Sequence, residues 1–219
     1  MLSLTITGGL GAGKTHLVDK LASYGFVVGS PATTMKRSLA AALAKEWGGG
    51  DDLAGDLFKE MMAQTTKDKY RLILQGYGEY FSNEDGFHWI NKTCNEVQQD
   101  IDHRRWTNDF TEVTGVVFDS IRRTEEIKGI MRDFPSSIIV RLDVSQSSQT
   151  DFLTKYLGRS PTDAVSILGH SSEHWLDDFG AYDIIIDADH GDNYIWDALL
   201  DGLQDFPAAE TFLKDRGVL

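Results

Sequence analysis

The sequence contains a single cysteine, Cys94, among its 219 residues. With only one thiol, the chain can form neither an internal disulfide nor a zinc site built from cysteines, and we expect Cys94 to be an unreactive packing residue. No run approaches the roughly 20 apolar residues that a membrane-spanning helix needs. The first residues are typical of a strand and not of a signal peptide. These absences predict a cytoplasmic protein with no membrane partner.

Positively charged residues are also few, with 21 Lys and Arg against 34 Asp and Glu, so that the formal net charge is −13. A protein that binds nucleic acid over a broad surface needs clustered Lys and Arg to contact the phosphates. The charge balance therefore disfavours that class of protein, although it leaves room for a small basic pocket. An apolar fraction of 41% and a length of 219 residues are ordinary values for one folded domain with a buried core.

The opening residues predict a β-turn-α-β unit, which begins a parallel sheet covered by helices. Residues 2–7 alternate apolar and hydroxyl side chains and lead into a glycine cluster. Residues 13–24 place apolar side chains at helical spacing. Residues 26–28 form a short apolar run, which is typical of a second buried strand.

The rest of the chain predicts three more strands, interrupted by two insertions. We expect these strands over residues 114–119, 137–143 and 182–187. Residues 31–106 form a helical insertion, whereas residues 145–178 look polar and irregular. The helices are expected over residues 32–47, 51–64, 69–81, 87–103, 125–134, 193–203 and 208–215. The predicted fold class is α/β, a three-layer sandwich whose parallel sheet has about five strands, in a single domain over residues 1–219.

Residues 8–15 read Gly-Gly-Leu-Gly-Ala-Gly-Lys-Thr and match the phosphate-loop pattern G-x-x-x-x-G-K-[ST] at every required position. The glycines let the backbone turn so that amide groups point inward, and the N-terminus of the next helix adds partial positive charge. Lys14 would reach the β- and γ-phosphates of ATP, and the Thr15 hydroxyl would bind Mg²⁺. The predicted ATP-binding residues are Gly8, Gly9, Leu10, Gly11, Ala12, Gly13, Lys14, Thr15 and His16.

A phosphate loop alone does not say what becomes of the γ-phosphate. The base-specificity motif N-K-x-D of GTPases is absent, since the nearest match, residues 91–94, ends on cysteine. The insertions over residues 31–106 and 145–178 fall where small-molecule kinases carry an acceptor-binding cap and a lid. Their placement favours phosphoryl transfer to a bound acceptor.

A second candidate site begins where the predicted strand over residues 114–119 ends, at the sequence D-S-I-R-R-T-E-E. In an open α/β sheet the carboxyl ends of the strands face the ligand crevice. Asp119 could there order Mg²⁺-bound water or the acceptor, and Arg122 could clamp an acceptor phosphate through two hydrogen bonds. The alternative is a plain strand end and helix start, with a surface ion pair between Arg123 and Glu126.

Together these motifs resemble those of the deoxynucleoside monophosphate kinases of bacteriophages, which are similar to dephospho-CoA kinase among the P-loop kinases. The pattern D-x-x-R-x-x-x-E is met by Asp119, Arg122 and Glu126. Residues 71–78 resemble the family motif R-x-x-L-Q-x-x-G, and residues 170–173 resemble its H-x-S-E motif. The landmarks extend over nearly the whole chain.

The resemblance implies that the γ-phosphoryl group of ATP is transferred, with Mg²⁺, to a deoxynucleoside 5′-monophosphate in the cytoplasm of a bacterial host. The implied catalytic residues are Lys14, Asp119, Arg122 and, from the lid, Arg159. The implied acceptor-binding residues are Lys36, Arg71, Gln75, Trp89, Asp119, Arg122 and Arg123. Without such a ligand, the charged members of this set would be ordinary surface residues and Trp89 would fill the core of the cap.

The chain departs from the family pattern in two places. Residues 78–83 contain no arginine where the family usually has one, and Arg159 is the only arginine between residues 142 and 215. Related phage kinases phosphorylate 5-hydroxymethyluracil in DNA, so a DNA partner with Asp119 as the base is the first alternative. The second alternative is a nucleotide-binding regulator that transfers nothing. The sequence leaves the oligomeric state open, a homodimer included.

Overall fold

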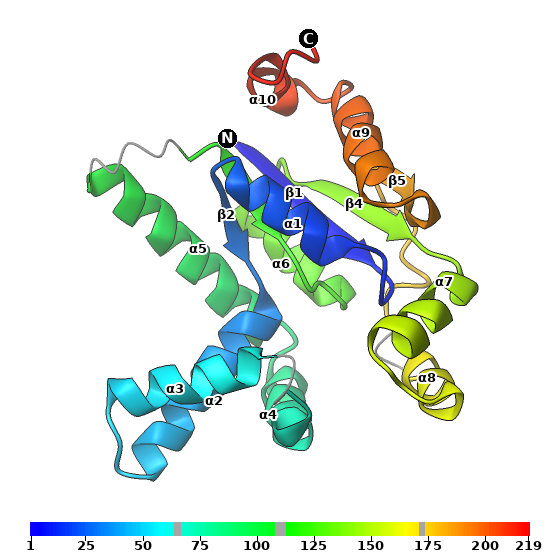
Figure 1. The fold of residues 1–219 in the computed structure, drawn as a ribbon. Coiled ribbons are helices and arrows are strands. Elements are labelled where there is room, and N and C mark those ends of the chain that lie inside the picture. The colour runs from blue at the N-terminus through cyan, green and yellow to red at the C-terminus, as the bar shows by residue number, and fades with distance from the viewer. Residues whose placement is uncertain (64–66, 108–112, 171–173) are drawn as a thin grey trace.

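The computed structural model describes residues 1–63, 67–107, 113–170 and 174–219. Its centre is a sheet of five parallel strands in the order β2-β3-β1-β4-β5 (Figure 1). The strands are β1 (Leu2–Gly8), β2 (Phe26–Gly29), β3 (Gly115–Phe118), β4 (Ile138–Asp143) and β5 (Ile184–Asp187). This arrangement confirms the predicted α/β sandwich with a five-stranded parallel sheet.

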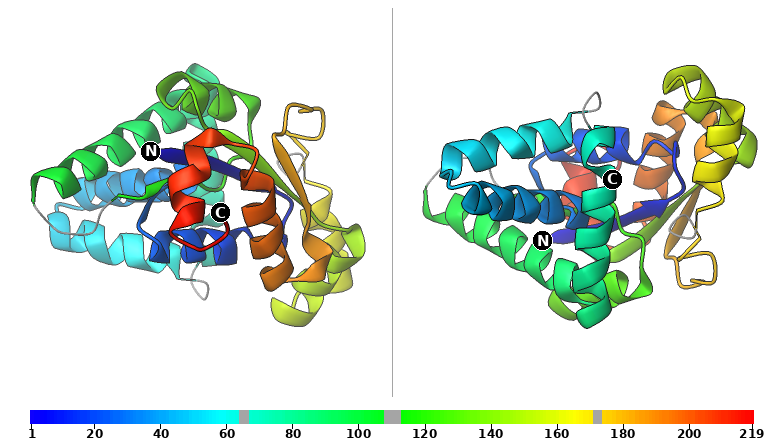
Figure 2. Two further views of the ribbon diagram at one scale, coloured as in Figure 1. Left: turned by 90° about the horizontal axis from the view of Figure 1, so that it is seen from above. Right: turned by 90° about the horizontal axis from the view of Figure 1, so that it is seen from below.

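Helices cover both faces of the sheet and make two separate cores. One face packs on α1 (Lys14–Ser23), α9 (Asp192–Leu203) and α10 (Glu210–Lys214). The opposite face packs on α5 (His88–Trp106) and α6 (Thr124–Asp133), so that the molecule has three layers (Figures 1 and 2). Buried Ile, Leu and Val dominate the strands, as expected for a parallel sheet that is covered on both sides.

The insertion after β2 forms a helical cap. Its first helix, α2 (Pro31–Glu46), begins directly after the strand because the Ser30 hydroxyl accepts a hydrogen bond from a backbone N–H in the first turn (3.4 Å). The cap continues through α3 (Asp51–Met62) and α4 (Arg71–Glu84). The buried members of its own small core are Leu39, Ala40, Ala44, Leu57, Met61, Tyr70 and Leu74.

The segment after β4 was expected to be irregular, and this expectation is wrong. It folds into α7 (Gln146–Asp151), a π-helical turn (Phe152–Tyr156) and α8 (Pro161–Leu168), which we call the lid (Figure 1). Ser145 and Ser160 cap the two α-helices by accepting backbone N–H bonds of 3.2 and 3.1 Å. The segment is mostly polar, and the few apolar residues that form its core are too widely spaced to show helical periodicity in the sequence.

The ends of the other predicted elements lie within three residues of those observed. Helix α4, for example, starts at Arg71 because a 3₁₀ turn, Lys67–Tyr70, precedes it. Gln64, the last residue of one predicted helix, lies outside the described residues, as do residues 171–173 of the H-x-S-E motif. Within the described part of the chain, no helix combines the length and the apolar character needed to cross a membrane.

Candidate functional site

The phosphate-loop motif forms a tight turn between β1 and α1. Gly8, Gly11 and Gly13 have φ values of 138°, 77° and 80°, a region that side chains with a Cβ atom rarely adopt. Gly13 is the N-cap of α1, so the first turn of this helix opens onto the loop. The motif therefore has the strand–loop–helix setting in which backbone amides can bind phosphate oxygens.

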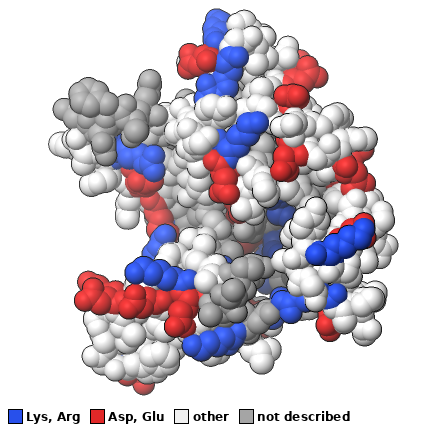
Figure 3. Space-filling view, viewed as in Figure 1, with Lys and Arg blue, Asp and Glu red and all other residues white. Residues whose placement is uncertain are grey.

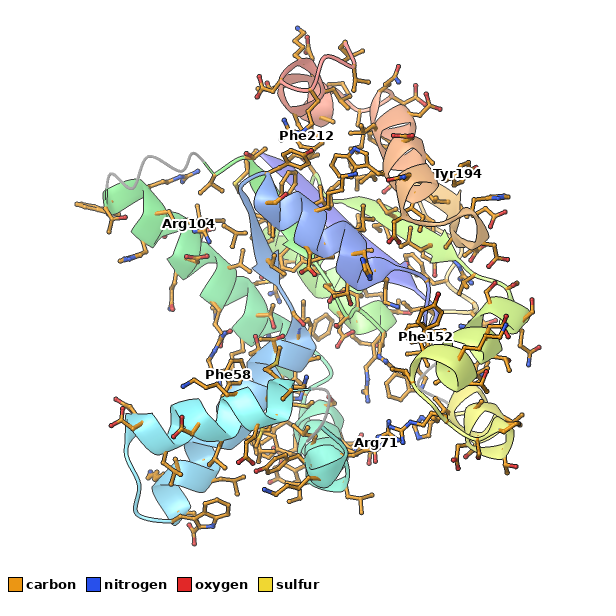
Figure 4. All side chains as sticks on the ribbon, in the orientation of Figure 1. Phe58, Arg71, Arg104, Phe152, Tyr194 and Phe212 are labelled. Atoms are coloured by element: carbon orange, nitrogen blue, oxygen red, sulfur yellow. The ribbon has the colours of Figure 1, made fainter. Side chains whose placement is uncertain are left out.

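The loop is enclosed by β4 and by the lid. A Cβ atom on Gly8 would lie 2.4 Å from the carbonyl oxygen of Leu142, and one on Gly11 would lie 3.1 Å from the Phe152 side chain. Figure 4 shows Phe152 pointing from the lid toward the loop. Leu10 packs against the lid core of Leu153, Ala164 and Leu168. The phosphate loop and the lid therefore share an apolar contact.

Lys14 is folded back over its own loop. Its ammonium group donates hydrogen bonds to the carbonyl oxygens of Gly8 (2.8 Å) and Gly9 (2.6 Å). These contacts hold the charge at the mouth of the turn, where a polyphosphate would compete for it. The next two residues of the predicted set, Thr15 and His16, are exposed, and His16 Nδ1 lies 3.4 Å from Asp192 Oδ2.

The second candidate site lies after β3, the strand next to β1. The backbone N–H of Asp119 donates to the carbonyl oxygen of Gly29 (2.8 Å), which fixes the strand end. Ser120 has φ 60°, the one positive value of a non-glycine residue within the described ranges, and its hydroxyl donates to Asp119 Oδ2 (3.1 Å). A strained residue beside a carboxylate at the carboxyl edge of a sheet is a recognised feature of functional sites.

Glu126 shapes the loop that carries the two arginines. Its Oε2 accepts the backbone N–H groups of Arg122 (2.8 Å) and Arg123 (3.0 Å), and desolvation of the carboxyl raises the pKa of Glu126. The Arg123 guanidinium lies 4.3 Å from the centre of the Trp175 ring, a cation–π contact. The helix start of the alternative is therefore present and is capped by Glu126, whereas the Arg123 guanidinium stacks on Trp175 and does not form the expected ion pair with Glu126.

One cavity of about 230 Å³ connects the two candidate sites. Its lining residues are Gly8, Gly9, Lys14, Ser120, Ile121, Arg122, Arg141, Leu142, Asp143, Val144, Gln149, Leu168, His174, Leu176, Asp177 and Tyr182. Lys14 and Arg122, which are 108 positions apart in the sequence, thus face one space. In the space-filling view, Lys and Arg atoms lie deep in the hollow near the centre of this face, whereas charges of both signs are mixed on the outer surface (Figure 3).

His174 joins the cavity wall to the lid. Its Nδ1 lies 2.7 Å from Asp177 Oδ2, and its Nε2 lies 2.9 Å from the carbonyl oxygen of Leu168, at the end of α8. Both ring nitrogens face acceptors, so both can donate only when the ring is an imidazolium. His174 and Asp177 were not predicted for this site, because their contacts depend on a loop that returns to the lid.

The predicted cap residues lie outside the cavity lining that the described residues form. Arg71 and Gln75 are exposed and one turn apart on α4, and Figure 4 shows Arg71 on the side of α4 toward α8. Lys36 approaches the Met62 sulfur at 3.7 Å. Trp89 is buried between α5 and α4: its indole N–H donates to the carbonyl oxygen of Gly78 (3.2 Å), and its ring lies 5.6 Å from that of Tyr77. It therefore packs against protein and does not line the cavity that the described residues form.

Arg159, the predicted lid arginine, is half-buried after the π-helical turn, and its backbone N–H donates to the carbonyl oxygen of Leu153 (3.0 Å). It does not line the cavity that the described residues form. Arg71, Gln75 and Arg159 would reach a ligand only if it extended from the cavity into the space between the cap and the lid.

A magnesium ion would find oxygen donors but no ready-made cage at this site. The described ranges contain no group of three or more His, Cys, Asp or Glu side chains that could hold a metal. The Thr15 hydroxyl and the Asp119 carboxylate are the hard oxygen donors nearest in sequence to the loop and to the β3 end. Such a sparse set fits Mg²⁺, which keeps several waters and shares phosphate oxygens with its nucleotide.

Comparisons with known proteins add the following. No protein-family model matches the sequence, and no curated protein matches it. Among solved structures, the crystal structure of TT1252 from Thermus thermophilus is similar, with a TM-score of 0.49 and 14% sequence identity, over 93% of this chain and 96% of that chain. A likeness at this level does not indicate an activity.

Proposed function

We propose that the protein is an ATP-dependent phosphotransferase that moves the γ-phosphoryl group to a deoxynucleoside 5′-monophosphate. The observation that carries the proposal is the shared cavity. The phosphate loop with Lys14 lines the same space as residues 120–122, which belong to the loop after β3 that carries Arg122 and Arg123, here called the arginine loop. A donor triphosphate on the loop and an acceptor phosphate at Arg122 would then lie next to each other. The motifs that resemble the phage deoxynucleoside monophosphate kinases supply the identity of the acceptor.

The chemistry requires positioning and charge neutralisation more than covalent help. The loop amides and Lys14 would hold the β- and γ-phosphates, and Arg122 would hold the acceptor phosphate. An oxygen of that phosphate attacks the γ-phosphorus while the bond to the β–γ bridging oxygen breaks and ADP leaves. Because the attacking phosphate oxygen is already anionic, no base is needed. The Thr15 hydroxyl would hold Mg²⁺, and Asp119 would order Mg²⁺-bound water or the acceptor. When bound, Mg²⁺ would neutralise the phosphate charges.

The cap and the lid would close around this centre. Arg71 and Gln75 lie on one exposed face of α4, so both can contact the same acceptor. Arg159 would contribute a further positive charge from the lid. The apolar contact of Leu10 with the lid core links movement of the lid to the phosphate loop.

The test is a transfer assay with radiolabelled ATP and Mg²⁺. Each deoxynucleoside monophosphate is offered separately, and DNA with and without 5-hydroxymethyluracil is offered in parallel. We expect labelled deoxynucleoside diphosphate, and its loss by at least about 100-fold in Lys14→Ala, because a charge-assisted phosphate contact disappears. Lys128→Ala, on the exposed side of α6, is the matched control and should transfer normally.

Three results separate the proposal from its alternatives. Label in hydroxymethyluracil-containing DNA but not in free nucleotides would replace the proposed acceptor with DNA. ATP binding without transfer to any acceptor would favour a nucleotide-binding regulator. Absence of ATP binding in the wild-type protein would overturn the nucleotide site itself.

A further inference from the structure

Arg141 stands out in a strand that is otherwise apolar. Strand β4 reads Ile-Ile-Val-Arg-Leu-Asp, and its other residues before the final aspartate are buried. A central strand of a parallel sheet normally carries a continuous apolar run, because both faces are covered. Placing a guanidinium group there costs desolvation free energy unless the group has partners or a ligand.

The strand register places Arg141 beside the phosphate loop. Thr7, the residue before Gly8, pairs with Arg141 in the sheet. Arg141 lines the same cavity as Lys14 and Arg122. Three cationic side chains, from the phosphate loop, the arginine loop and β4, therefore converge on one space of about 230 Å³.

Two partners hold the Arg141 guanidinium in place. Nη1 donates to the Tyr182 hydroxyl (3.2 Å), which in turn donates to the carbonyl oxygen of Leu176 (3.0 Å). The guanidinium also lies 5.1 Å from the centre of the Tyr182 ring, and Nε donates to Asp143 Oδ1. Nη2 has no hydrogen-bond partner within the described ranges, so the group keeps donors for a ligand.

The partner carboxylate is the exchangeable part of this arrangement. Asp143 is about half exposed at the end of β4, and it is opposite Asp187 in the register with β5. Water can solvate the Asp143 carboxylate if the arginine leaves it, because the side chain is already about half exposed. Tyr182, by contrast, is packed against Phe179 with ring centres 4.9 Å apart and would stay in place.

We propose that Arg141 is a third phosphate-binding residue of this cavity, with Tyr182 as its positioning residue and Asp143 as a carboxylate that a phosphate oxyanion displaces. The inference rests on the proposed function, because it assigns Arg141 to the phosphate groups handled there. The ligand class is a polyphosphate or phosphate monoester, whose oxygens match the planar donors of arginine. No bond is made or broken at Arg141.

The experiment measures binding of inorganic tripolyphosphate with Mg²⁺ by calorimetry, without nucleoside or acceptor. Arg141→Gln should weaken binding about ten- to a hundredfold, which is the effect of losing charge-assisted hydrogen bonds. Arg141→Lys should recover only part of this loss, because lysine lacks the planar fork. Asp143→Asn should bind tripolyphosphate at least as tightly as the wild type, since it removes the competing carboxylate.

The control is Arg104→Gln, which removes a guanidinium that is likewise paired with an aspartate, Asp100, at 3.1 Å. Arg104 lies toward the far end of α5 (Figure 4), and its variant should bind normally. Tyr182→Phe keeps the ring but loses the hydroxyl, and it should weaken binding a few-fold without unfolding the protein. Urea unfolding of each variant identifies any loss that comes from stability alone.

The outcomes distinguish this inference from the function on which it rests. If Lys14→Ala loses tripolyphosphate while a folded Arg141→Gln binds it like the wild type, the role of Arg141 is overturned and the phosphate site stands. If Asp143→Asn binds tripolyphosphate more weakly than the wild type, the proposed displacement of the Asp143 carboxylate is also overturned, because the carboxylate would then assist binding. If the wild type itself does not bind tripolyphosphate, both the inference and the proposed phosphate site fail.

Discussion

Substitution of Gly8 by alanine should damage the protein far more than substitution of its neighbour Gly9. Gly8 has φ +138°, and a Cβ atom there would lie 2.4 Å from the backbone oxygen of Leu142. The β4 backbone cannot yield without disturbing the sheet. A Cβ atom on Gly9 would lie 2.3 Å from Gln149 Nε2, at the end of a flexible side chain, and the φ of Gly9 is not in the region that favours glycine.

The magnitude follows from these two contributions. Forcing a residue with a Cβ atom into a conformation that favours glycine lowers the free energy of unfolding by on the order of 1–3 kcal/mol. An overpacked contact lowers it by about another 1–3 kcal/mol. We therefore expect Gly8→Ala to lower the free energy of unfolding by about 3 kcal/mol, or the melting temperature by about 6–12 °C. Gly9→Ala should stay within about 1 kcal/mol of the wild type, because the glutamine can rotate away.

The assay is urea unfolding followed by the fluorescence of the five tryptophans. It is repeated with saturating Mg-ATP, because a bound ligand raises the unfolding free energy only of a protein that binds it. Gly9→Ala should be stabilised by ATP, whereas Gly8→Ala should lose most of that stabilisation. Two results would refute the reasoning about the loop backbone. One is an equal loss of stabilisation by ATP in the two variants, and the other is a Gly8→Ala protein whose unfolding free energy lies within about 1 kcal/mol of the wild type.

The remaining predictions concern the lid and the lone thiol. Leu153→Ala truncates a large buried side chain of the lid core and should cost about 2–4 kcal/mol of lid stability, seen as faster amide exchange over residues 146–168. Unchanged exchange would refute the role of the lid core. Burial raises the pKa of Cys94 from 9.0 to about 12, so iodoacetamide should label the native protein at pH 8 only as fast as it opens. The thiol ionises at lower pH in the unfolded chain than in the folded protein. Its contribution to the free energy of unfolding should therefore be constant below pH 9.0 and fall as the pH rises toward 12. Cys94→Ala should remove this pH dependence.

Local signals predicted the elements that are built from neighbouring residues. The β1–loop–α1 unit is an example, because its glycines, lysine and helical spacing all lie within one short segment. The segment over residues 145–178 was predicted as a lid, but its helices were missed, for the opposite reason. Its helices begin at serine caps, but the apolar residues Leu153, Ala164 and Leu168 are separated by polar and glycine-containing stretches, so no sustained period reveals them.

Pairings between distant segments decided the candidate site. By its residue type alone, Trp89 could either stack on a ligand or pack inside the protein, and only the contact of α5 with α4 shows that it packs against Tyr77 and Phe81. Arg141 broke the apolar pattern of its strand, which is a signal that sequence reasoning could have used. Its partner Tyr182 lies 41 positions later, and no local pattern connects the two.

The sequence by itself determined the phosphate loop, the α/β class and the order of the strands along the chain, because hydrogen-bonding needs and side-chain periodicity act over a few residues. Only the tertiary structure decided which of the candidate cations share a cavity and what holds each of them. That choice depends on strand register and loop closure, which are set by the packing of the whole sheet. Among the described residues, the cavity lining therefore contains none of the predicted cap residues, and it gains Arg141 of β4.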